Sequence, residues 1–95
     1  MLFDKPVKSG EVITVKLTTG EELIARFEED SDQTLTISKP VVLAPGAQGI
    51  GMVTWIMSAD PAKVQLNKDT IILFATTQKE VADKYTEMTS SIKLI

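Results

Sequence analysis

The side chains best suited to chemistry in this sequence are carboxylates, and they concentrate in one short segment. Glu28, Glu29, Asp30 and Asp32 lie close together, and carboxylate oxygens are the ligands that Ca²⁺ and Mg²⁺ prefer. Their spacing lacks the glycine and the terminal bidentate glutamate of a calcium-binding loop. The segment therefore favours a solvated turn, and we predict no metal site.

The composition omits the residues on which most other catalytic chemistry depends. The chain of 95 residues contains no histidine and no cysteine. This removes the commonest general base, the commonest transition-metal ligand, and every thiol nucleophile or disulfide. The sequence also has no glycine-rich phosphate loop and no nucleophile elbow. We expect a protein that is not an enzyme and needs no cofactor, with a carboxylate-based hydrolase as a remote alternative.

The charge and the hydropathy of the sequence limit which partners the protein is expected to bind and in which compartment it is expected to lie. The formal net charge is −3, and six acids but one base lie between Glu21 and Asp32. Nucleic-acid-binding proteins usually carry a basic stripe, so this balance argues against nucleic acid. The length fits one domain. Because no apolar run has the length of a membrane span and the N-terminus does not resemble a signal peptide, we expect a cytoplasmic protein.

Alternating apolar and polar residues predict the strands that must position the acidic segment. A strand at 11–19 would bury Ile13, Val15 and Leu17, and a strand at 22–28 would bury Leu23, Ala25 and Phe27. The turn between them contains Gly20, and the acidic loop follows the second strand. A third strand begins near Gln33 with Leu35 and Ile37 buried, and Pro40 requires an edge or a bulge there.

The rest of the chain predicts two more strands and a helix. A turn-rich loop at 44–49 precedes a fourth strand at 51–58, and a short piece at 64–66 leads to a fifth strand at 70–76. The fifth strand is apolar on both faces, so both sides should be covered. At 77–93 the period becomes helical, with Thr77 and Glu80 as a capping box. The helix carries an apolar stripe that either packs on the strands or binds a partner: Val81, Tyr85, Met88 and Ile92.

These residues resemble the Sm-like (LSm) family over about 10–76. Gly20 falls on the turn glycine of the first family motif, Ala25 on its second glycine, and Leu35 and Ile37 on its third-strand positions. The second motif, apolar-Arg-Gly followed by an apolar strand, corresponds to 66–74. The piece at 59–63 looks like an insertion. The short, acidic sequence is similar to Sm-like proteins of bacteriophages.

The resemblance implies a fold and an assembly. The family fold is a small, strongly bent, five-stranded antiparallel SH3-like barrel, here as a single domain. An extended arm at 1–9 would precede the barrel at 10–76, and the C-terminal α-helix would follow at 77–93. In the family, strand four of one subunit pairs with strand five of the next in a ring. The contact is then expected at Met52, Trp55, Ile56, Ile72 and Phe74. Trp55 is expected in the core or this contact, with a base-stacking platform as the alternative.

The resemblance also implies a site, although the sequence departs from the family there. An Asp and an Asn in the loop before strand three hold a base, and the Arg of the second motif stacks on it. Here Thr34 replaces the Asn, Asn67 the Arg and Lys68 the Gly, whereas Asp30 or Asp32 can take the Asp place. The candidate RNA-binding residues are Asp30, Asp32, Gln33, Thr34, Asn67 and Lys68. We expect single-stranded RNA binding at the pore of a homo-oligomeric ring; the alternative is an assembly module that has lost RNA binding.

Overall fold

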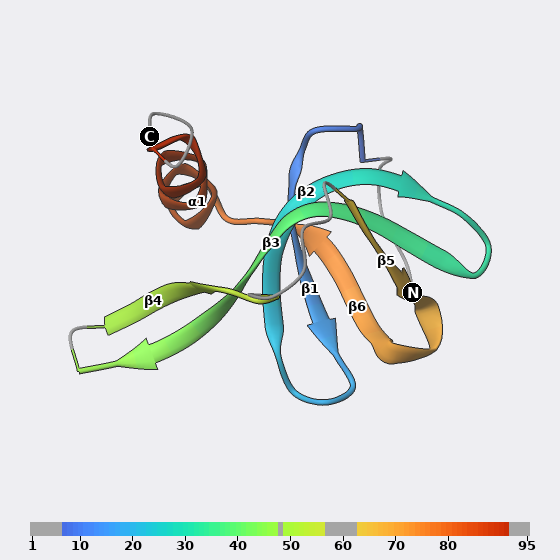
Figure 1. Ribbon diagram of the computed structural model, residues 1–95, viewed down its shortest axis with the longest axis horizontal. Coiled ribbons are helices and arrows are strands. Elements are labelled where there is room, and N and C mark those ends of the chain that lie inside the picture. The colour runs from blue at the N-terminus through green and yellow to red at the C-terminus, as the bar shows by residue number, and fades with distance from the viewer. Residues whose placement is uncertain (1–6, 48, 57–62, 92–95) are drawn as a thin grey trace.

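The computed structural model of this chain describes residues 7–47, 49–56 and 63–91, which form one antiparallel sheet and one helix (Figure 1). The strand order is β4-β3-β2-β1-β6, and β5 pairs with β3 as well. The predicted five strands were wrong by one, because the expected fourth strand stops early and the piece at 64–66 is a strand of its own. In chain order the elements are β1 (Val12–Leu17), β2 (Glu22–Asp30), β3 (Thr34–Gly46), β4 (Gly49–Thr54), β5 (Lys63–Asn67), the 3₁₀ turn η1 (Lys68–Thr70), β6 (Ile71–Thr76) and α1 (Lys79–Ser91).

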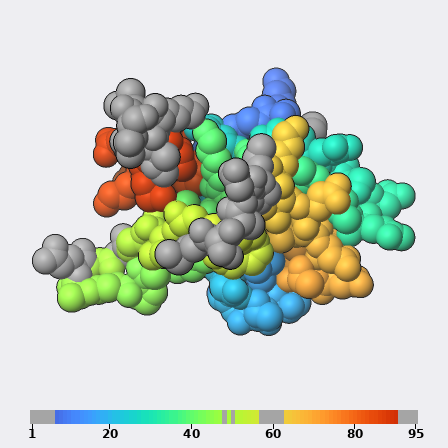
Figure 2. Space-filling model, in the orientation of Figure 1, coloured from blue at the N-terminus to red at the C-terminus, as the bar shows by residue number. Residues whose placement is uncertain are grey.

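The long strand β3 organises the sheet. Its first half pairs with β5, its second half pairs with β4, and β2 runs along its other side. Between the halves, Lys39 and Pro40 face Ala25 alone in the β2–β3 register, so β3 bulges there. Lys39 adopts a φ of 50°. The bulge that Pro40 required is thus confirmed, and it bends the strand so that the β3–β4 hairpin projects from the body (Figure 2).

The core lies on one face of the bent sheet, as the alternation predicted. Ile13 and Val15 of β1 and Leu35 and Ile37 of β3 are fully buried. Phe27 and Phe74 stack with their ring centroids 6.4 Å apart. The buried members of this cluster are Ile13, Val15, Leu17, Leu23, Ala25, Phe27, Leu35, Ile37, Leu66 and Phe74.

Helix α1 covers part of the opposite face. Tyr85 is completely buried and packs with Ile24 of β2 and Val41 of β3. The Tyr85 hydroxyl donates to the Lys39 carbonyl at 2.7 Å, and the Arg26 guanidinium lies 5.8 Å from the centre of the Tyr85 ring. The prediction that Val81, Tyr85 and Met88 pack on the strands is confirmed, whereas Ile92 lies outside the described residues.

Two details of the helix and its linker differ from expectation. Thr77 is buried before the helix begins at Lys79. Its hydroxyl lies 2.9 Å from the Thr14 hydroxyl, because the linker runs against β1. The Thr77 side chain therefore contacts the sheet instead of capping the helix.

Within 7–47, 49–56 and 63–91, no helix is long and apolar enough to cross a membrane.

The prediction that both sides of the last strand are covered was wrong: in a single chain, part of β6 is exposed to solvent. Phe74 is buried, but Ile72 and Leu73 are 56% and 45% exposed. Ile72 is the extra residue where the β1–β6 register shifts, and β6 pairs only with β1 among the described strands. The outer edges of β6 and β4 are thus the two ends of the strand order, and β4 carries Val53, 51% exposed.

Candidate functional site

Two loops that are distant in sequence meet at one end of the sheet. One is the hairpin between β2 and β3, and the other is η1, which joins β5 to β6. They are neighbours because β5 pairs with the first half of β3, which places Thr34 opposite Asn67. The Lys68 backbone N–H donates to the Gln33 carbonyl at 2.9 Å. We call residues 30–34 and 67–69 the loop pair; it unites all six candidate RNA-binding residues.

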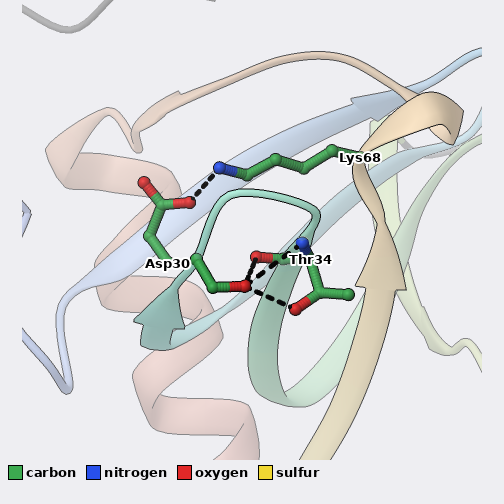
Figure 3. Close-up of polar contacts among 4 residues, drawn as sticks. Asp30, Thr34 and Lys68 are labelled. Atoms are coloured by element: carbon green, nitrogen blue, oxygen red, sulfur yellow. Dashed lines mark hydrogen bonds and ion pairs between the residues drawn. The ribbon is translucent and has the colours of Figure 1, made fainter.

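The β2–β3 half of the loop pair is a tight turn closed by Ser31 and Thr34. The Ser31 N–H donates to the Thr34 carbonyl at 3.0 Å, and the two hydroxyls lie 2.8 Å apart (Figure 3). The Ser31 Oγ also accepts a hydrogen bond from the Thr34 backbone N–H at 3.3 Å. Asp32 and Gln33 at the tip are exposed. The sequence reasoning did not single out Ser31, although serine beside acidic residues is a common turn signal.

The η1 half presents one amide and one ammonium. Asn67 is exposed, and its side chain makes no capping hydrogen bond to the turn that follows. The Thr70 hydroxyl donates to the Asn67 carbonyl at 2.7 Å, which closes the turn. Lys68 reaches across to the other loop, where its Nζ lies 2.5 Å from Asp30 Oδ1 (Figure 3). The two loops are therefore joined by one backbone hydrogen bond and one ion pair.

The electrostatic balance of the loop pair is acidic. Asp30, Asp32 and Asp69 lie in it, against the single ammonium of Lys68. Further along β2, Glu28 accepts a hydrogen bond from the Ser38 hydroxyl at 2.7 Å and pairs with Lys63 at 3.8 Å. Among the described residues, no group of three or more acids, histidines or cysteines is arranged to hold a metal ion. What the loop pair offers a ligand is hydrogen-bonding groups and one ammonium that is already paired.

The residues expected at a subunit contact fall into three settings. Ile72 is exposed on the outer strand β6. Met52, Trp55 and Ile56 are half-buried; Met52 packs toward α1 and Trp55 against the main core. Phe74 is buried in the core of this chain, so its side chain is not at the surface. Val53 and Leu73, which the sequence reasoning did not select, are more exposed than four of the five.

No protein-family model and no curated protein matches this chain.

Proposed function

We propose that this chain is a non-enzymatic, Sm-like protein that forms a homo-oligomeric ring and binds single-stranded RNA at the loop pair. The observation that carries the proposal is the meeting of the two loops. Residues 30–34 and 67–69 are separated by more than thirty positions in the sequence, yet Thr34 and Asn67 are register partners. The Sm-like resemblance places a base-binding site at this junction.

The strand edges support the assembly part of the proposal. β4 and β6 are six residues long each, end the strand order and expose large apolar side chains at Val53, Ile72 and Leu73. An exposed apolar edge strand invites pairing with another chain. Pairing β6 of one copy with β4 of the next satisfies both edges by one repeated contact, and a closed cycle repeats the loop pair around its axis.

Lys68 provides the test of RNA binding. Lys68→Glu should weaken the binding of short A-rich or U-rich RNA and flatten its salt dependence, because fewer counterions are released. The matched control is Lys84→Glu, which makes the same charge change at an exposed position on α1. A filter-binding titration at low and high salt measures both. Equal losses in the two variants would mean that RNA responds to overall charge and does not bind at the loop pair.

The second candidate function is an assembly module that does not bind RNA. The observation that favours it is the pairing of Lys68 with Asp30 in an acidic neighbourhood. On this alternative the protein has the mass of an oligomer in solution, and neither RNA binds it at low salt. The two measurements together separate the candidates, because both predict assembly and only the first predicts a complex with RNA.

A further inference from the structure

The ammonium of Lys68 is already held by the chain's own carboxylate. Lys68 Nζ lies 2.5 Å from Asp30 Oδ1, so the two groups form an ion pair. The Lys68 side chain is 23% exposed and the Asp30 side chain 41%. The lysine is therefore the less exposed partner, and its side chain extends from its own loop across to Asp30 (Figure 3). A phosphate that approaches Nζ therefore competes with this carboxylate for the ammonium.

Lys68 is the one cation of the loop pair, which lies entirely within the described residues. Asp32 and Asp69 are exposed in the same loop pair, and Lys63, at the other end of β5, faces Glu28 at 3.8 Å. An incoming phosphate therefore meets negative charge, and its closest cationic partner in the loop pair is Lys68. At that ammonium it competes with Asp30.

We infer that Asp30 is an internal competitor for the phosphate of a bound single strand, and that it sets the affinity of the loop pair for polyanions. The inference rests on the proposed RNA-binding function. Ion pairs between partly exposed groups contribute little to stability, so a phosphate can displace the carboxylate. In that exchange Lys68 gives up its ion pair with a carboxylate and gains one with a phosphate, so the net gain in charge interaction is small. An anion that offers charge alone therefore binds weakly, whereas a strand that also forms hydrogen bonds with the loop groups binds more tightly.

The test is a gain of binding rather than a loss. Asp30→Asn keeps the size of the side chain and one acceptor oxygen but removes the negative charge that pairs with Lys68. The matched control is Asp69→Asn, which removes the same charge from the loop pair at a position outside the six candidate RNA-binding residues and forms no ion pair among the described residues. We expect Asp30→Asn to bind short single-stranded RNA about 3–10-fold more tightly than Asp69→Asn at low salt.

A double variant tests whether the gain in RNA affinity depends on Lys68. Asp30→Asn combined with Lys68→Gln should return to the affinity of Lys68→Gln alone. If wild type binds RNA and the two aspartate variants gain equally, the internal competition is refuted while RNA binding stands. If neither wild type nor Asp30→Asn binds at low salt and the oligomer is intact, both the inference and the RNA-binding proposal fail, and the assembly module remains.

Discussion

Gly20 is the residue whose backbone allows the first hairpin. It sits in the turn between β1 and β2 with a φ of 108°, and a Cβ built on it would meet no atom within 4 Å. Any cost of a side chain there is therefore conformational rather than steric crowding by neighbours. The sequence predicted this position correctly, because a tight turn between two alternating segments requires a residue that tolerates positive φ.

Replacing Gly20 by alanine tests the turn at the level of one residue. Gly20→Ala should lower the free energy of unfolding by about 1–3 kcal/mol, since the backbone is held in a region that L-residues avoid. Gly51→Ala is the control: its φ is not positive, and its new Cβ would make an ordinary contact at 3.8 Å. Urea denaturation of both variants gives the comparison. Equal midpoints would contradict the assigned turn geometry.

Lys68 and Asp30 show which contacts between individual residues could be predicted from the sequence and which could not. The proximity of their two loops followed from the resemblance, and the structure brings the loops together. The ion pair itself was not predicted, because it depends on the end of a flexible lysine crossing from η1 to β2. Strand periodicity fixes which face a residue occupies but not which of several nearby acids a lysine contacts.

At the scale of elements, Tyr85 fastens α1 to the bend in β3. Its hydroxyl donates to the carbonyl of Lys39, the residue with the left-handed backbone. Tyr85→Phe keeps the ring and leaves that carbonyl without its donor. We expect a loss of about 1 kcal/mol in the free energy of unfolding. Ser90→Ala, which removes an exposed hydroxyl from the same helix, should leave stability unchanged in the same denaturation experiment.

The same tyrosine predicts an alkaline transition. Burial raises the pKa of Tyr85 from its usual value of 10.0 to about 12. The folded state therefore binds the phenolic proton more tightly than the unfolded chain does. This contribution to stability is complete below pH 10 and is lost as the pH rises through about 12. The chain has one tyrosine, so its ultraviolet ionisation spectrum reports this group alone. A midpoint near 10 would contradict the burial, and Tyr85→Phe should lack this part of the pH dependence.

Which elements could be predicted depended on whether the signal was local. Ile13, Val15 and Leu17 alternate within one strand, and their burial was predicted correctly. Ile24 was not among the residues expected to be buried in its strand, but it is buried because a helix more than fifty residues later in the sequence covers its face of the sheet. That the piece at 64–66 forms the strand β5 was also missed, because it was expected only to lead into the last strand. Its strand character depends on pairing with β3, which no local pattern records.

At the scale of the whole molecule, the exposed apolar edges test the proposed assembly. Ile72→Lys places a charge at a position that is 56% exposed. The folded monomer should tolerate it, whereas a lysine on an edge strand opposes pairing with another chain. Gln78→Lys makes the same charge change at an exposed position outside the strand.

Light scattering should show an oligomer for wild type and Gln78→Lys, and a smaller species for Ile72→Lys with its circular dichroism preserved. A wild-type mass of one chain at micromolar concentration would overturn the assembly. An unchanged oligomer in Ile72→Lys would move the contact away from β6.

The pairing of β1 with β6 also governs the order of events after synthesis. β1, β2 and β3 are joined by short turns, but the pairing that places β6 brings together residues as far apart in the sequence as Ile13 and Thr76, 63 positions. Closing so long a loop costs more chain entropy than closing a hairpin, so we expect it late in folding. Until then Phe74 is missing from the core, and the edge that carries Ile72 and Leu73 has no fixed position. A nascent chain would therefore have no complete β6 edge to offer a neighbour, and we expect the proposed association to follow the closing of each copy on itself.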